Sequence, residues 1–143
     1  MHIELTDEQH ALQIRLRSYF RGLLTPDEID VMLTDRHGDV YRDVVSRMGR
    51  DGWLGVGWPV EYGGRGFGEV EQTIFVNEAS RRDIPLPYVT LQTVGPVLQQ
   101  YGTPEQKEFF LPRILSGDLH FAIGYTEPSA GTDLANLRTS AVR

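Results

Sequence analysis

Apolar side chains recur at intervals of three and four residues along most of the chain, which is the spacing of one face of an α-helix. The first such stretch covers residues 7–23. Thr6, with Gln9 three places later, is typical of a capping box at a helix start. One face of this stretch carries the apolar residues Leu12, Leu16, Tyr19, Phe20 and Leu23. The pattern therefore predicts an amphipathic helix at the start of the chain.

The same period predicts further helices over residues 26–33, from 39 to a stop at Gly52, over 69–82 and 88–101, and from 104 through Phe109 and Phe110. Thr25-Pro26 and Thr103-Pro104 are typical helix starts, each with Glu or Gln three places after the threonine. Proline lacks an N–H group and disturbs a helix interior. We therefore expect Gly95-Pro96 to kink or divide its helix, and Pro112 to start a second short turn that ends at Gly117.

Two regions depart from the helical period. Residues 53–68 contain six glycines and a proline, so they predict a glycine-rich connection with Trp53 and Trp58 as buried anchors. From Leu119 to Tyr125 apolar and small or polar residues alternate, which predicts a strand, and residues 137–142 are expected to begin a second one. The fold expected is mainly α: a helical bundle over residues 1–117, followed over 118–143 by the first strands of a β-domain.

Composition narrows the possible functions. The net charge is -6 and Lys107 is the single lysine, which argues against nucleic acid as a partner because phosphate binding needs clustered basic residues. Cysteine is absent, and the four histidines show no paired ligand spacing, so no metal is expected. No stretch approaches the roughly 18 apolar residues of a membrane span. We expect a cytoplasmic protein without a membrane partner.

Residues 126–133, TEPSAGTD, are the most informative motif. Small residues after a proline let backbone amides approach an anion, and the Thr132 hydroxyl is placed to add a hydrogen bond, so a cofactor phosphate would fit there. Composition alone favours the other interpretation, an ordinary turn rich in Gly, Pro, Asp and Ser. The glycines of 63–68 do not align with a phosphate-binding loop and are interpreted as structural.

Several blocks together resemble one family. GYTEPSAGTDLAN at 124–136 is similar to the signature of the acyl-CoA dehydrogenases. The tyrosine at position 125 also occurs in sequences that resemble actinobacterial members of the family. Gly57-Trp58-Pro59 with EYGG at 61–64, and YGTPEQKEFFLPRILSGD at 101–118, match further blocks of that family in order. The resemblance covers essentially the whole chain. It implies the family's N-terminal helical domain over 1–117 and the truncated beginning of its flavin-binding β-barrel domain over 118–143.

The resemblance also implies an activity: FAD-dependent oxidation of an acyl-CoA to the trans-2-enoyl-CoA, by removal of an α-proton and transfer of a β-hydride. It places Thr126 at the flavin near N5 and O4, Ile123 and Tyr125 at the ring through their backbones, and Gly131 and Thr132 near the pyrophosphate. Thr132 would also contact the CoA side. The helix over 88–101 would border the acyl pocket. Tyr125 and Asn136 depart from the residues usual in the family, which affects the details of flavin contact.

The family's base comes from a C-terminal helical domain, so no catalytic residue is assigned in this chain. We expect a fragment or truncated product that is inactive alone. The partners implied are an acyl-CoA substrate, an electron-transfer protein, and other subunits of a homo- or hetero-oligomer. The alternative is a non-catalytic helical interaction subunit, or a truncated product, that pairs with a full-length dehydrogenase.

Overall fold

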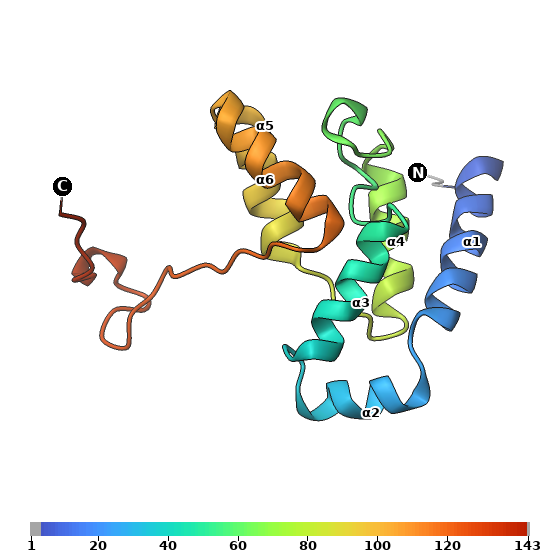
Figure 1. Ribbon diagram of the computed structural model, residues 1–143, viewed down its shortest axis with the longest axis horizontal. Coiled ribbons are helices and arrows are strands. Elements are labelled where there is room, and N and C mark those ends of the chain that lie inside the picture. The colour runs from blue at the N-terminus through green and yellow to red at the C-terminus, as the bar shows by residue number, and fades with distance from the viewer. Residues whose placement is uncertain (1–3, 143) are drawn as a thin grey trace.

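The computed structural model describes residues 4–142, and the outermost positions of the two predicted domains, 1–3 and 143, lie outside them. The molecule is a helical bundle with a C-terminal segment that leaves it as extended chain (Figure 1). The mainly α fold is therefore confirmed. Its helices are α1 (Asp7–Leu23), α2 (Pro26–Thr34), α3 (Asp39–Arg50), α4 (Glu69–Ser80), α5 (Gly95–Tyr101) and α6 (Pro104–Ser116), with the π-helical η2 (Val89–Val94) and the 3-10 turns η1 (Val60–Tyr62) and η3 (Leu134–Asn136).

Capping boxes begin three of these helices as predicted. Thr6, Thr25 and Thr103 each accept a hydrogen bond from the backbone of the third helical residue, whose side chain reaches back to the threonine's own amide. These bonds satisfy amides that a helix start leaves unpaired. The local sequence therefore fixes where α1, α2 and α6 begin.

Helices α1 and α4 lie side by side and share an ion pair (Figure 1). Arg17 donates to both carboxylate oxygens of Glu78, with N–O distances of 2.8 and 3.0 Å. Glu78 is only 2% exposed, and the hydrogen bonds from Arg17 lower the pKa of its carboxyl. A buried carboxylate is tolerated because both its oxygens are paired. The pair thus fixes the register of α1 against α4.

The glycine-rich connection carries the two predicted aromatic anchors. Trp53 and Trp58 are each 6% exposed and belong to the core. The Trp53 ring lies beneath the guanidinium of Arg65, 4.0 Å from the ring centroid. Gly52, the predicted stop of α3, has a φ of 72°, which glycine adopts without strain. The connection is irregular but packed.

The helix over 88–101 divides into two elements at Gly95-Pro96, where the sequence predicted a kink or a division: the π-helical η2 ends at Val94 and the α-helical α5 begins at Gly95. The two follow one another without a gap, and the Gly95 amide donates to the Thr90 carbonyl five residues back. In that register Pro96 would be the donor to the Leu91 carbonyl, and proline has no N–H. The indole Nε1 of Trp58 donates to this carbonyl instead, at 3.1 Å. A tertiary hydrogen bond thus replaces the missing helical one.

Pro112 does not start a separate turn, and that prediction was wrong. Helix α6 runs unbroken through it to Ser116 and ends at Gly117, whose φ is 79°. Leu111 and Ile114, on either side of the proline, are buried at 2% and 1% exposure. Packing of these two side chains into the core holds the helix together where local propensity alone would end it.

The strands predicted over 119–125 and 137–142 were also wrong. Among residues 4–142 the structure contains no strand, and the extended chain after Gly117 makes only one isolated bridge, between Glu127 and Ala130. A strand is defined by a neighbour that supplies its ladder of hydrogen bonds, and neither segment has one. The two-residue alternation correctly indicated extended backbone but not pairing.

Within residues 4–142, no helix is both long and apolar enough to cross a lipid bilayer.

Candidate functional site

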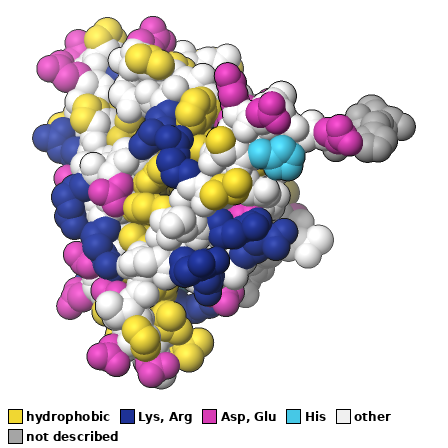
Figure 2. Space-filling model, turned by 90° about the vertical axis from the view of Figure 1, so that its right-hand side faces the viewer, with side chains coloured by type: hydrophobic (Ala, Val, Ile, Leu, Met, Phe, Trp, Pro, Cys, Tyr) yellow, Lys and Arg dark blue, Asp and Glu magenta, His cyan; other side chains and the backbone are white. Residues whose placement is uncertain are grey.

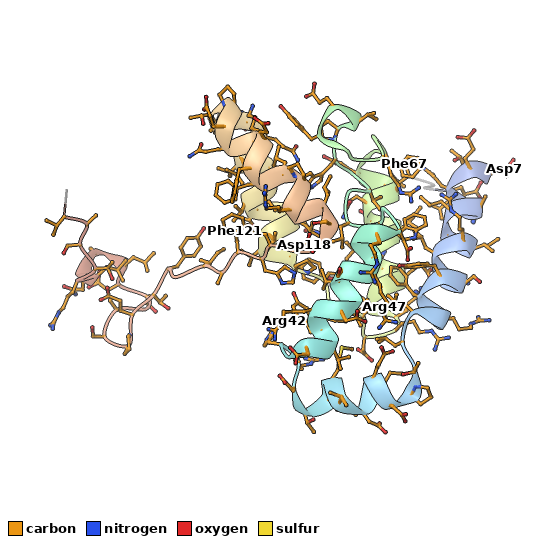
Figure 3. The ribbon with its side chains drawn as sticks, viewed as in Figure 1. Asp7, Arg42, Arg47, Phe67, Asp118 and Phe121 are labelled. Carbon is orange, nitrogen blue, oxygen red and sulfur yellow. The ribbon has the colours of Figure 1, made fainter. Side chains whose placement is uncertain are left out.

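The five residues predicted to contact a cofactor lie on the extended segment outside the bundle (Figure 3). All five are exposed: Ile123, Tyr125, Thr126, Gly131 and Thr132. Ile123 is 39% exposed and Tyr125 66%, which is high for large apolar or aromatic side chains. The bundle itself therefore covers none of the five. Any enclosure of a ligand at this segment needs a second surface opposite it.

The segment is attached to the bundle at its beginning. The Leu119 amide donates to the Arg113 carbonyl at 3.1 Å, and the Phe121 amide donates to Oγ1 of Thr90 at 2.8 Å. The Phe121 ring packs on Phe110 of α6, with centroids 5.6 Å apart. From 122 to 126 no hydrogen bond to the bundle occurs among the described residues. Phe121 is thus the last anchored position before Thr126.

Beyond Thr126 the chain closes on itself around Glu127. The backbones of Glu127 and Ala130 exchange two hydrogen bonds, of 3.0 and 3.1 Å, across a tight turn. The Glu127 carboxylate accepts from the Arg138 amide at 2.9 Å, from the Thr139 amide at 2.7 Å, and from the Thr139 hydroxyl. The carboxylate thereby ties residue 127 to residues 138 and 139. Gly131 and Thr132 lie inside the loop that it closes.

Glu127 is part of the TEPSAGTD motif, but no role was predicted for it. Its partners lie 11 and 12 residues away, and no sequence period connects a turn carboxylate to backbone amides at that distance. The signal that was present is an acidic residue directly before a proline turn, which is common in ordinary loops. Its role is evident only from its hydrogen bonds to residues 138 and 139 in the folded chain.

We expect the Glu127 loop to open at low pH. Hydrogen bonds from the Thr139 hydroxyl and from the amides of residues 138 and 139 lower the pKa of Glu127. A lowered pKa means that the stabilising contribution is fully present above the unfolded value, about 4.3, and is lost as pH falls through the folded value. Amide exchange at Thr139, followed by NMR through that range, measures it.

A matched pair of variants checks the assignment. Glu127→Gln is expected to speed exchange of the Thr139 amide at neutral pH, whereas Glu108→Gln, at an exposed position on α6, leaves it unchanged. Equal protection of Thr139 in the Glu127→Gln variant and the original chain would show that the carboxylate does not hold the loop.

The local geometry fits the predicted contacts with a flavin nucleotide on one side. A Cβ added at Gly124 or Gly131 would meet nothing within 4 Å, so the backbone at both positions is open to a ligand. The hydroxyls of Thr126 and Thr132 have no hydrogen-bond partner among the described residues. Open backbone and free hydroxyls are what a ring edge and a phosphate require. The segment thus offers one wall of such a site.

A groove with a volume of about 740 Å³ lies next to this wall, between η2 and residues 117–123. Thr90, Phe121 and Ile123 line it, and so do Tyr41 of α3 and Tyr88. Burial raises the pKa of Tyr41. The Tyr41 ring makes edge contacts with His37 and His120, at centroid distances of 5.7 and 5.3 Å. The groove therefore has an aromatic side, and its lining extends along the segment to Ile123, three residues before Thr126.

A second cleft, of about 820 Å³, lies between the end of α1, α2 and the residues after α4. Its floor includes Phe20 and Ile84, and none of the five candidate residues lines it. Four arginines line this cleft: Arg21, Arg36, Arg81 and Arg82.

The face of the molecule on the side of α1 carries basic, acidic and apolar side chains together (Figure 2). This face is not a continuous basic surface.

Among residues 4–142, no three His, Asp or Glu side chains are grouped closely enough to hold a metal ion.

Comparison with known proteins identifies the family. Residues 6–118 match the model of the acyl-CoA dehydrogenase N-terminal domain. The chain belongs to the acyl-CoA dehydrogenase family. The predicted resemblance is therefore confirmed. Acyl-CoA dehydrogenase FadE29 of Mycobacterium tuberculosis is 66% identical over 143 residues, which are 100% of this chain and 37% of the relative. FadE26 of the same organism is 52% identical, with the same shares covered.

Solved acyl-CoA dehydrogenase structures share the fold. A chain of the ChsE4–ChsE5 complex from Mycobacterium tuberculosis matches with a TM-score of 0.92 at 53% identity, over 100% of this chain and 36% of that one. A chain of the Tcur3481–Tcur3483 steroid ACAD matches with a TM-score of 0.92 at 51% identity, over 100% and 38%. The chain thus spans little more than a third of the length of these relatives.

Proposed function

We propose that this chain supplies the N-terminal helical domain, residues 1–117, and the start of the flavin-binding domain, residues 118–143, of an FAD-dependent acyl-CoA dehydrogenase. The observation that carries the proposal is the segment 122–132, on which all five candidate residues are exposed, beside an aromatic groove, in a chain whose whole length aligns with FadE29 at 66% identity. An exposed segment with free hydroxyls and open glycines is suited to receive a cofactor that a second domain covers.

The reaction proposed is oxidation of an acyl-CoA to the trans-2-enoyl-CoA. FAD, when bound, supplies the acceptor for the hydride from the β-carbon. Thr126 would donate a hydrogen bond from its hydroxyl to the edge of the ring and so stabilise negative charge there. Backbone atoms of Ile123 and Tyr125 would orient the ring. Gly131 and Thr132 would hold the pyrophosphate, and Thr132 would also contact the CoA side. The base that removes the α-proton is not assigned to this chain.

The acyl group proposed is bulky and polycyclic. One solved relative is a steroid acyl-CoA dehydrogenase, and the groove between η2 and residues 117–123 is lined by the rings of Tyr41, Tyr88 and Phe121. Flat aromatic side chains suit a rigid apolar ring system. In this arrangement η2, the first part of the stretch 88–101 to which the resemblance gives this role, borders the acyl group through Val89 and Thr90. Tyr88, which is 43% exposed, lies at the edge of the groove.

The assembly proposed contains two different kinds of subunit. Two of the solved relatives are complexes of two named proteins, ChsE4 with ChsE5 and Tcur3481 with Tcur3483. A second subunit would cover the exposed segment, and an electron-transfer protein would reoxidise the enzyme. The rival function, a helical interaction subunit without a catalytic part, predicts assembly without flavin chemistry. The two proposals therefore differ in what the assembled complex does.

A chimera tests the proposed function. The matching part of the related chain in the Tcur3481–Tcur3483 complex is replaced by these 143 residues, and the unaltered complex serves as control. The expected result is a yellow complex whose flavin absorbance is bleached by a polycyclic acyl-CoA. A complex that assembles but holds no flavin, or is not bleached by any acyl-CoA, would contradict the proposal and favour the interaction role.

The 143-residue chain by itself is expected to remain colourless and catalytically silent. All five candidate residues are exposed, so they offer one wall and no enclosure, and a ligand held on one side loses little of its water. The measurement is a titration with FAD followed by visible absorbance and by addition of acyl-CoAs. Stoichiometric yellow protein that bleaches would show that residues 1–143 contain a complete site.

A further inference from the structure

We propose that Thr90 is a positioning residue: its hydroxyl oxygen sets the path of residues 121–126 and hence the place of Thr126 beside the groove. The inference rests on the proposed function for its catalytic consequence. Its structural part stands on contacts within this chain. Thr90 lies in η2, one helical element of the bundle, and Phe121 begins the segment that leaves it (Figure 3).

The contact is a single hydrogen bond in a buried position. Oγ1 of Thr90 accepts from the Phe121 amide at 2.8 Å, and Thr90 is 1% exposed. Between this bond and the turn at Glu127, no hydrogen bond ties the segment to the bundle among the described residues. β-Branching leaves a helical threonine two favoured χ1 rotamers, and the Thr90 side chain is almost fully buried, so few positions are open to its Oγ1. The direction of the chain toward Thr126 is therefore fixed at Thr90.

The π-helical register of η2 explains why the hydroxyl oxygen of Thr90 lies within reach of the Phe121 amide. Thr90 and Leu91 are neighbours, and their two carbonyls are bound differently: the Gly95 amide donates to Thr90, whereas the Trp58 indole donates to Leu91. A Cβ on Gly95 would lie 2.2 Å from Cζ2 of Trp58, so the ring and the helix are in direct contact. π-turns within helices frequently occur at functional sites. Here the π-turn places the Thr90 hydroxyl toward the departing chain.

Phe121 adds a second, apolar constraint on the same residue. Its ring packs on Phe110, which itself packs against the core, and its backbone is held by Thr90. The ring contact prevents Phe121 from leaving α6, while the hydrogen bond fixes the orientation of its peptide plane. Loss of the hydrogen bond alone thus leaves the segment attached but free to rotate. The predicted effect is on the precision of the site rather than on folding of the bundle.

Three variants of the 143-residue chain test the structural part. Thr90→Val keeps the shape and removes the acceptor, Thr90→Ser restores it, and Thr93→Val changes an exposed threonine of the same π-helix as a control. We expect amide exchange at Phe121 to rise about ten-fold in Thr90→Val, in line with the loss of one part-buried hydrogen bond. We expect less than a three-fold change in the other two, and none in α1 for any variant. Unchanged exchange at Phe121 in Thr90→Val would overturn the proposal.

The same variants in the chimeric complex test the functional part. Thr90→Val is expected to lower the rate of flavin reduction about ten-fold with little change in KM, and Thr90→Ser is expected to restore it. Equal reduction rates in a yellow Thr90→Val complex would overturn the positioning role, even where Phe121 exchange has risen. Failure of the proposed function looks different, because the chimera with the original Thr90 would then be colourless or unreactive.

Discussion

Replacing Gly49 with alanine is expected to lower the free energy of unfolding by about 2 to 3 kcal/mol, because the added methyl group has no room. A Cβ at Gly49 would lie 2.3 Å from the Ser116 carbonyl oxygen and 2.8 Å from that of Leu115. Both atoms belong to the backbone of α6, so no side-chain rotation relieves the clash. Helices α3 and α6 would have to separate at the point where Gly49 allows their close approach.

Gly22 provides the matched control, since it is also a glycine within a helix. A Cβ there would meet nothing within 4 Å, and the residue is exposed near the end of α1. Gly22→Ala is therefore expected to stabilise the protein by about 0.5 to 1 kcal/mol, because alanine lowers the conformational entropy of the unfolded chain. Urea denaturation of both variants measures the difference. A Gly49→Ala chain as stable as the Gly22→Ala chain would show that α3 and α6 do not pack this closely.

Replacing Thr126 with valine is expected to slow flavin reduction by about 10²-fold, while the flavin is retained. The side chain keeps its shape but loses the hydroxyl, which has no other hydrogen-bond partner among the described residues and is therefore available to the flavin. Retention is expected because Gly131, Thr132 and the covering surface still hold the nucleotide. Stopped-flow bleaching of the chimeric complex by a saturating acyl-CoA is the measurement.

Thr126→Ser serves as the control for this prediction because it restores the hydroxyl. It is expected to reduce flavin at a rate within a few-fold of the original. Bleaching by Thr126→Val at the original rate would exclude Thr126 from the reaction. If the Thr126→Val complex lost part of its flavin but the flavin still bound were bleached at the normal rate, Thr126 would have a role in binding alone.

Features that depend on neighbours a few residues apart could be predicted from the amino-acid sequence. The capping boxes at Thr6, Thr25 and Thr103 begin helices because each bond joins residues three places apart. Gly52 and Gly117 end helices because a positive φ is costly for other residues. The buried faces of the helices follow from their period. The family could also be recognised from the sequence, because TEPSAGTD and each of the blocks before it are short, uninterrupted stretches of residues.

Features that join distant parts of the chain depend on long-range contacts, which no local pattern predicts. The sequence predicted a kink or a division at Gly95-Pro96, but not its form: a π-helix changes to an α-helix there, and the Trp58 indole, 33 residues away from Leu91, supplies the donor that proline lacks. Pro112 stays within α6 because its neighbours are buried. Each of these outcomes depends on a contact whose energy exceeds the local preference, and local preference is all that a short sequence window records.

The candidate site divides in the same way. Thr126, Gly131 and Thr132 were found from one short motif, whereas Thr90 and Glu127 act through partners 31 and 11 or 12 residues away. The alternation from Leu119 to Tyr125 determined that the backbone is extended. Whether that backbone pairs depends on a neighbouring strand, because a ladder needs the hydrogen-bonding groups of two chains. Local patterns thus fixed conformation and residue type, and long-range contacts decided position and pairing.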